Sequence, residues 1–89
     1  MQFTWQESKR RTNLKKHGFD FAQAEAVFDG PTLSVEDASN YAGEQRFNST
    51  GLLGVQTVVI CHTETPEQIH IISMRKAETH ETRRYFSYL

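Results

Sequence analysis

The sequence predicts an α+β domain in which an antiparallel sheet of three to four strands carries two N-terminal helices and one C-terminal helix, in the order β-α-α-β-β-β-α. Helix signals fill residues 8–30, β-rich runs fill the middle of the chain, and a helical pattern returns after residue 77. Because 89 residues make room for one small core, we expect residues 1–89 to form a single domain.

The N-terminal segment begins with a predicted short strand at residues 3–5. A first helix is expected to begin at Ser8, whose hydroxyl suits a helix cap, and to end at His17. Gly18 follows and supplies the left-handed backbone that closes many helices. Leu14 is the clearest apolar anchor of this otherwise polar helix.

The second helix has a stronger sequence signature. Asp20 is a suitable cap, and Gln23 follows three residues later, which is the spacing of a capping box. The helix is expected to end at residues 29–31, Asp-Gly-Pro, and its apolar stripe is expected to enter the core. The stripe consists of Phe21, Ala24, Val27 and Phe28.

The strongest β-rich runs lie at residues 52–62 and 68–75. The turn between them contains Pro66, which cannot continue a central strand, so the two runs predict an antiparallel hairpin. Weaker strands are expected at residues 32–35 and 44–48, on either side of a polar turn around residues 37–43.

Strict alternation divides the last strand into two largely apolar faces, so this strand is expected to be central and covered on both sides. A C-terminal helix over residues 77–89 completes the predicted fold. One face of the strand holds Ile69, Ile71, Ser73 and Arg75, and the other holds His70, Ile72 and Met74.

Charge is distributed unevenly, although the formal net charge is only -1. Residues 9–16 carry five cations, whereas residues 20–45 carry six acidic side chains and no cation. This separation favours a basic surface that meets nucleic acid or an acidic partner, and a solvated helix face is the alternative.

The cysteine and histidine content argues against a disulfide or a metal site. The single cysteine, Cys61, lies in an apolar run and is expected to be a small buried filler. His62, His70 and His80 are too scattered for a metal site, so no cofactor is expected and the strand histidines are predicted to be exposed. No apolar run approaches about 18 residues and no export signal precedes the domain, which favours a cytoplasmic location away from membranes.

Arg75 and Lys76 end the apolar run that begins at Ile71. A strand end with two cations is a suitable phosphate-binding site, because arginine offers a rigid fork of hydrogen-bond donors and lysine offers a compact charge. The alternative is a solvated strand end in which these cations make a surface ion pair with Glu78.

A set of short motifs, in order along the chain, resembles one known family. The motifs are Phe3-Thr4-Trp5; Lys16-His17-Gly18-Phe19 with Phe21, Ala24 and Val27-Phe28-Asp29; Glu44-Gln45-Arg46-Phe47 before Gly51-Leu52-Leu53; and Ile71-Ile72-Ser73-Met74-Arg75-Lys76-Ala77 with Glu81 and Tyr85. Together they closely resemble the BrnT family of toxin-antitoxin systems, over essentially the whole chain. The chain departs from the family at Gln6, where aspartate is common, and at Met74, where alanine is common.

The resemblance implies a fold similar to that of the RelE-type small ribonucleases and growth inhibition through RNA cleavage. It also implies neutralisation by BrnA, a ribbon-helix-helix antitoxin, in a complex that represses its own operon, so that contact with DNA is indirect. Because ribbon-helix-helix proteins dimerise, we expect a heterotetramer of two toxins and two antitoxins.

RNA cleavage without a metal needs a proton acceptor for the 2′-hydroxyl, cations around the phosphorane-like transition state and a proton donor for the leaving 5′-oxygen. Arg46 and Arg75 each match a family motif and are expected to stabilise the charge of the transition state. Lys76 is a weaker third candidate for the same role.

Three residues are candidates for proton transfer. His17 matches the family motif Lys-His-Gly, and the alternative is that it only stabilises the C-terminus of its helix. Glu81 and Tyr85 lie four residues apart on the last helix, so they share a face and are candidates for base and hydroxyl donor. The alternative is that Glu81 pairs with Arg83 or Arg84 while Tyr85 packs on the sheet.

The lysines of the first helix, Lys9, Lys15 and Lys16, are expected to bind RNA phosphates or an acidic segment of the antitoxin. Phe86 and Leu89, near the end of the chain, are expected to extend the antitoxin contact.

Trp5, Phe47 and Tyr41 are aromatic residues that could stack on bases. Core packing is the expected role of Trp5 and Phe47. The alternative function of the whole chain is a non-catalytic module, a decayed toxin that only binds protein or nucleic acid. The near-neutral net charge favours this alternative, because an enzyme that attracts RNA is generally expected to be basic.

Overall fold

The computed structural model describes residues 1–38 and 43–89, so Tyr41 and most of the predicted turn at 37–43 lie outside the described residues. The elements, in chain order, are β1 (Gln2–Thr4), α1 (Glu7–His17), the short 3-10 helix η1 (Phe21–Gln23), α2 (Ala24–Asp29), β2 (Leu33–Glu36), β3 (Phe47–Leu53), β4 (Gln56–Thr65), β5 (Gln68–Lys76) and α3 (Thr79–Tyr88).

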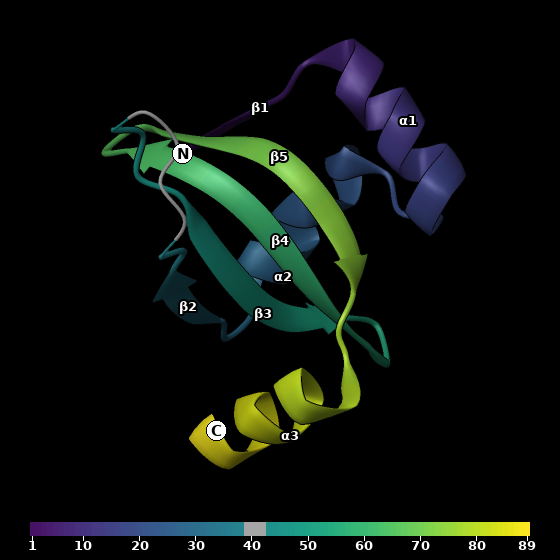
Figure 1. Cartoon of the computed structure of the whole chain (residues 1–89), viewed down its shortest axis with the longest axis vertical. Coiled ribbons are helices and arrows are strands. Elements are labelled where there is room, and N and C mark those ends of the chain that lie inside the picture. The colour runs from purple at the N-terminus through teal and green to yellow at the C-terminus, as the bar shows by residue number, and fades with distance from the viewer. Residues whose placement is uncertain (39–42) are drawn as a thin grey trace.

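The strands form one sheet in the order β1-β5-β4-β3-β2 (Figure 1). The α+β class is confirmed, and the order of elements is consistent with a RelE-like fold. In the described residues the sheet has five strands and is mixed, because β1 joins it as a parallel neighbour of β5 while the other neighbouring strands run antiparallel. The short strand predicted at residues 3–5 is confirmed as β1, but its parallel direction was not predicted, and the sheet has one strand more than the three to four expected.

Helix α1 begins one residue earlier than predicted, with Gln6 rather than Ser8 at the cap position and no side-chain bond from that residue. Its end is as predicted: Gly18 has a φ of 79°, and its N–H donates to the carbonyl of Leu14 at 2.9 Å. Leu14 itself is 39% exposed, so its prediction as the apolar anchor was wrong.

Asn13 anchors α1 instead, through polar contacts. Its buried amide donates to the carbonyls of Phe19 at 3.1 Å and Met74 at 2.8 Å, and it accepts from the N–H of Met74 at 3.1 Å. These bonds satisfy backbone groups of β5 that the neighbouring helix would otherwise leave unpaired, so α1 is fixed to the strand at one position.

The capping box predicted for the second helix is confirmed. The side chain of Asp20 accepts from the N–H of Ala22, and the side chain of Gln23 accepts from the N–H of Asp20, both at 3.0 Å. The first turn is a 3-10 turn that continues into α2. The predicted stripe packs on one face of the sheet, in a core that contains Phe21, Ala24, Val27, Val58, Ile60, Ile71 and Met74.

Two glycines set the path of β3. A Cβ at Gly51 would lie 2.7 Å from Cγ1 of Val27, so glycine allows α2 to approach the sheet closely. Gly54 has a φ of 61° and forms the turn between β3 and β4. The predicted continuous strand at residues 52–62 was therefore wrong, since it spans the end of one strand, this turn and most of the next strand.

A β-bulge in β5 changes which side chains face the core. Cys61 pairs with Ser73 and His62 pairs with Ile71, so Ile72 is an extra residue with no partner in β4. Met74 therefore joins Ile71 in the core, whereas Ser73 turns to the opposite face. The alternation predicted for this strand was wrong from the bulge onward.

Helix α3 lies at one end of the sheet, away from α1 (Figure 1). It covers part of the face opposite α2, where Glu81 and Arg84 line a small cavity together with Thr50 and Val59 of the sheet. The ring of Tyr85 is fully buried and its hydroxyl donates to the carbonyl of Pro31 at 2.7 Å, which attaches α3 to the start of β2.

Candidate functional site

The sheet face opposite α2 is polar where α3 does not cover it. We call this surface the open face, and its central row is formed by Asn48, Cys61 and Ser73, which are register partners on β3, β4 and β5. All three residues are partly exposed. The row therefore offers an amide, a thiol and a hydroxyl to anything that lies across the sheet.

Arg46 stands at one corner of the open face, immediately before β3. Its carbonyl accepts from the N–H of Asp37 at 2.8 Å, which continues the pairing of β2 with β3. Because strand side chains alternate, Arg46 faces the same side as Asn48. Its Nε donates to Oε1 of Glu44 at 2.8 Å, so this guanidinium is held by a carboxylate.

Arg75 stands at another corner of the same face and is also held by a carboxylate. Its two terminal nitrogens donate to the two oxygens of Glu81, at 2.8 and 2.9 Å. This bidentate bond lowers the pKa of Glu81 to about 2. The partner of Glu81 is therefore Arg75, and neither Arg83 nor Arg84 makes the ion pair considered from the sequence.

The two arginines share the open face but are spaced apart on it. Arg75 pairs with Val59, which pairs with Thr50, four positions beyond Arg46. This spacing corresponds to roughly 13 Å along the strands and about 10 Å across them. The structure therefore places the two guanidinium groups on one face without bringing them to a single phosphate.

Cys61 lies between the candidate cations. Burial raises the pKa of its thiol, and the charges of Arg46 and Lys9 act in the opposite direction. Arg75 also interacts with the thiol, although its own pKa is raised chiefly by the bond to Glu81. Cations from α1, from the start of β3 and from the end of β5 thus act on the centre of the open face. The prediction of Cys61 as a buried filler holds only in part, because the residue is half-buried.

A groove of about 290 Å³ runs between α1 and β5, and we call it the α1–β5 groove. Two lysines and a histidine line it, Lys9, Lys16 and His17, and their side chains have no hydrogen bond or ion pair within the described part of the chain. Ser73 lines this groove and also belongs to the central row of the open face, so the two surfaces are continuous. The other lining residues are Ser8, Thr12, Asn13 and Ile72.

Three of the predicted site residues lie elsewhere. Lys15 is exposed on α1 and does not line the groove. Lys76 pairs with the core residue Val58, so it points to the face opposite Arg75, and the two adjacent cations do not form a common phosphate seat. Tyr85 is buried with its hydroxyl bonded to a carbonyl, which corresponds to the packing role considered from the sequence.

The histidines differ from their predicted exposure. His62 is 1% exposed, its Nε2 lies 2.7 Å from Oγ of Ser49, and the rings of Phe28 and Phe47 pack against it. Burial lowers its pKa. His70 lies on the other face, where its Nδ1 is 2.9 Å from Oγ1 of Thr4. Among the described residues, no three histidine, cysteine or acidic side chains gather in a way that suits a metal ion.

Sequence reasoning missed Asn48 and Ser73 as candidate functional residues. Ser73 was assigned to an apolar face because the bulge was not visible in the pattern, and Asn48 was the end of a poorly defined strand. The predicted packing roles of Trp5 and Phe47 are confirmed, since Trp5 contacts Phe21 and Phe47 stacks on His62.

Comparison with known proteins supports the resemblance found in the sequence. The model of the family described as "Ribonuclease toxin, BrnT, of type II toxin-antitoxin system" matches residues 5–81. A comparison with curated proteins gave no match. None of the helices in the described residues has the length and apolar character needed to cross a membrane. A match over most of the chain, on a fold consistent with RelE-like proteins, shows that this chain belongs to the BrnT family of ribonuclease toxins of type II toxin-antitoxin systems.

Proposed function

We propose that this toxin cleaves RNA on the open face without a metal ion, with the RNA backbone passing from the α1–β5 groove over Ser73 toward Arg46. The observation that carries the proposal is that unpaired cations and a histidine line a groove that is continuous with a polar sheet face. A surface of this kind attracts phosphates and offers hydrogen bonds to the sugars and bases between them.

The groove residues are proposed to act closest to the scissile phosphate. Lys9 and Lys16 bind phosphate oxygens, and His17 exchanges protons with the reacting oxygens. In the reaction, the 2′-oxygen loses its proton to a base and bonds to phosphorus, the bond from phosphorus to the 5′-oxygen breaks, and that oxygen receives a proton. The products are a 2′,3′-cyclic phosphate and a 5′-hydroxyl.

The two arginines are proposed to stabilise negative charge on the same strand of RNA from the sheet. Arg75 has five N–H groups, of which three are used in bonds to Glu81 and to the carbonyl of Lys76, so two remain for a phosphate. Glu81 acts as a positioning residue for Arg75, because a carboxylate with a pKa of about 2 is a weak base. Arg46 acts from the opposite corner of the open face.

The partner proposed for this toxin is a BrnA-type ribbon-helix-helix antitoxin. Two toxins and one antitoxin dimer form a heterotetramer, and DNA is contacted through the antitoxin alone. Lys15, Arg83 and Arg84, which are exposed and outside the groove, are available to an acidic segment of that partner.

Incubation of the purified toxin with RNA, in the presence of a chelator, tests the proposal. Arg75→Ala is expected to reduce the cleavage rate about 10²-fold, and Arg46→Ala, which acts on a different phosphate, is expected chiefly to weaken RNA binding. Lys76→Ala, next in sequence to Arg75 but on the other face, is expected to cleave normally. Loss of cleavage with the chelator contradicts the metal-free mechanism. Binding of RNA without any cleavage supports the non-catalytic alternative instead.

A further inference from the structure

Strand β1 is a free edge of the sheet in the described chain. It is the terminal strand in the sheet order, and the N–H of Gln2 donates toward β5, to the carbonyl of Glu67 at 2.8 Å. Because the backbone groups of successive strand residues point to opposite sides in the plane of the sheet, the N–H and C=O of Phe3 point away from β5. An unpaired strand edge of this kind is a template for another extended chain.

Two cavities flank β1 on the side that faces α2. One, of about 540 Å³, is lined mainly by residues 1–5 and by Phe21, Ala22 and Glu25. The other, of about 440 Å³, is lined by Met1, Phe3, Glu25, Phe28, Asp29 and Ile69. They share Met1, Phe3 and Glu25, so they form one groove along the strand, which we call the β1 groove.

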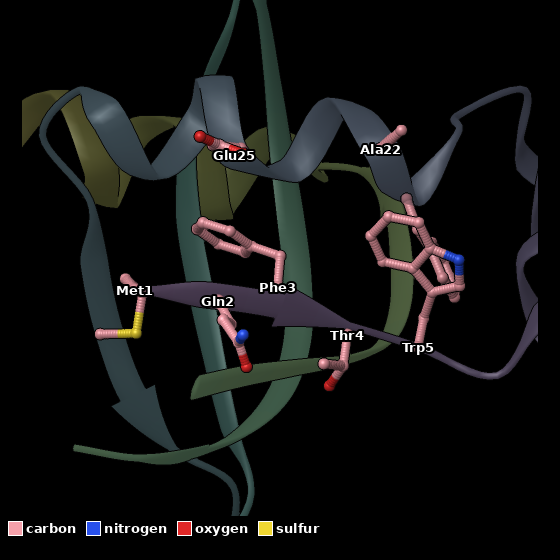
Figure 2. A pocket seen from close by; sticks show the side chains of 8 residues that line it. Met1, Gln2, Phe3, Thr4, Trp5, Ala22 and Glu25 are labelled. Carbon is pink, nitrogen blue, oxygen red and sulfur yellow. The ribbon is translucent and has the colours of Figure 1, made fainter. Parts of the chain in front are cut away.

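Figure 2 shows how the side chains divide along this strand. Phe3 and Trp5 rise toward the helical segment that carries Ala22 and Glu25, whereas Gln2 and Thr4 point the other way. Phe3 lies 5.8 Å from Phe28 between ring centroids, and Trp5 lies 6.4 Å from Phe21. The floor of the β1 groove is therefore aromatic, and its two cavities suit apolar side chains placed at every second residue of an added strand, roughly 7 Å apart.

The charge of the β1 groove excludes nucleic acid and selects a basic chain. Glu25 and Asp29 lie one turn apart on α2 and have no ion-pair partner among the described residues. Among residues 1–38 and 43–89, no lysine, arginine or histidine side chain lines either cavity. An occupant that places lysine or arginine beside this helix gains two ion pairs, whereas a phosphate backbone meets repulsion.

The β1 groove is separate from the proposed RNA site. None of its lining residues lines the α1–β5 groove, and of those on β1 only Gln2 and Thr4 point to the face opposite α2. A chain bound along β1 therefore leaves Lys9, Lys16 and His17 uncovered.

We infer that the β1 groove binds an extended segment of the antitoxin, in which apolar residues alternate with lysine or arginine and which adds to the sheet beside β1. The inference rests on the antitoxin partner proposed above, and the unpaired strand edge and the two carboxylates beside it are the features that select an extended basic segment of that partner. Main-chain bonds to Phe3 give affinity, the two cavities select apolar side chains, and Glu25 and Asp29 select positive charge.

The test uses the purified toxin and the purified antitoxin of its own operon, with affinity measured by calorimetry and without RNA. Ala22→Trp fills the groove from an exposed position on η1 and is expected to weaken binding at least tenfold, whereas Ala26→Trp, exposed on the adjoining α2 outside the groove, is expected to change it less than twofold. Glu25→Lys is expected to weaken binding about tenfold and to reduce its salt dependence, with Glu36→Lys on β2, at the opposite edge of the sheet, as the control.

Hydrogen exchange gives an independent readout. The amide of Phe3 is expected to become protected in the complex and to remain unprotected in the complex of Ala22→Trp. Equal affinity of the Ala22 and Ala26 variants, or an unprotected Phe3 amide in the wild-type complex, overturns the inference. The inference is also overturned if Ala22→Trp weakens self-association of the toxin but leaves antitoxin binding unchanged. That result would assign the groove to a second copy of the toxin. RNA cleavage by each variant is measured separately, so a failure of the catalytic proposal is recognised independently.

Discussion

The cations of the α1–β5 groove and the arginines of the sheet differ in what holds them. Lys9 and Lys16 line the groove without a carboxylate partner in the described residues, whereas Arg46 and Arg75 are bonded to Glu44 and Glu81. The groove cations are thus ready to exchange water for a phosphate, while the sheet arginines are already fixed in place. A fixed guanidinium with spare N–H groups can position a phosphate, whereas a lysine ammonium on its flexible chain chiefly attracts the phosphate by its charge.

The difference teaches that a cationic residue matched to a motif has two separable properties, its position and its availability. Arg10, on the same helix as the groove lysines, illustrates this, since it donates to both Glu7 and Asp20 and lies outside the groove. Its charge attaches α1 to the following turn. The cations of α1 therefore fall into two groups. Arg10 stabilises the fold, whereas Lys9 and Lys16 face solvent in the groove.

The largest expected effect is on catalysis from the groove. His17→Gln removes the proposed proton-transfer group at an exposed position, so the cleavage rate is expected to fall about 10³-fold with little change in stability. The pH dependence of cleavage between about pH 5 and 8 is expected to flatten in the variant. A full-rate His17→Gln enzyme would limit this residue to stabilising the end of its helix.

The attachment of the groove to the sheet is the next feature to break. Asn13→Ala leaves the N–H and C=O of Met74 without partners, so the free energy of unfolding is expected to fall by about 2 kcal/mol. Leu14→Ala, at the neighbouring exposed position, is the matched control and is expected to cost under about 0.5 kcal/mol. Chemical denaturation measures both, and the reverse order would restore Leu14 as the anchor.

A comparison within α1 sharpens the distinction between groove and exposed cations. Lys16→Ala is expected to weaken RNA binding several-fold and to reduce the slope of log affinity against log salt by about 0.7, which corresponds to one phosphate contact. Lys15→Ala, next in sequence but outside the groove, is expected to leave the slope unchanged. Equal slopes for the two variants would show that α1 acts only through its total charge.

The smallest effect concerns the ion pair that fixes Arg75. The folded pKa of Glu81 is about 2, below its ordinary value of 4.5, so the pair stabilises the fold fully above about pH 4.5 and loses its contribution as the pH falls toward 2. Glu81→Gln is expected to cost about 1 kcal/mol at neutral pH, because the pair is partly exposed to solvent. Urea titrations at pH 7 and pH 3 measure this difference, which is expected to shrink at the lower pH.

Features set by neighbouring residues were predictable from the sequence. Gly18 ends α1 and Asp20 caps the next turn because each acts on backbone groups within four residues along the chain. Features set by distant residues were not. Asn13 is buried because it bonds to Met74, 61 positions away, and His62 is buried because Ser49 and two aromatic rings surround it.

The candidate site divides in the same way. Motif matching located Arg46, Arg75 and His17, and the structure places all three on the open face or in the adjoining groove. The carboxylate that pairs with each arginine depends on how the following turn or helix is placed. The sequence suggested Glu78 as the partner of Arg75, but α3 places Glu81 there instead. The side to which Ser73 points depends on how β5 is aligned with β4, and the sequence of β5 alone does not determine that alignment.

The unmatched residue at Ile72 has a consequence for how this chain tolerates change. Met74 is buried and Arg75 faces the opposite side because β5 has one residue more than β4 at this point. If Ile72 instead paired with β4 and the bulge were lost, even alternation would turn the guanidinium of Arg75 inward and the thioether of Met74 to solvent. A one-residue deletion here could therefore be absorbed by loss of the bulge, with both side chains on their present faces, whereas a one-residue insertion would need a second unmatched residue to keep them there.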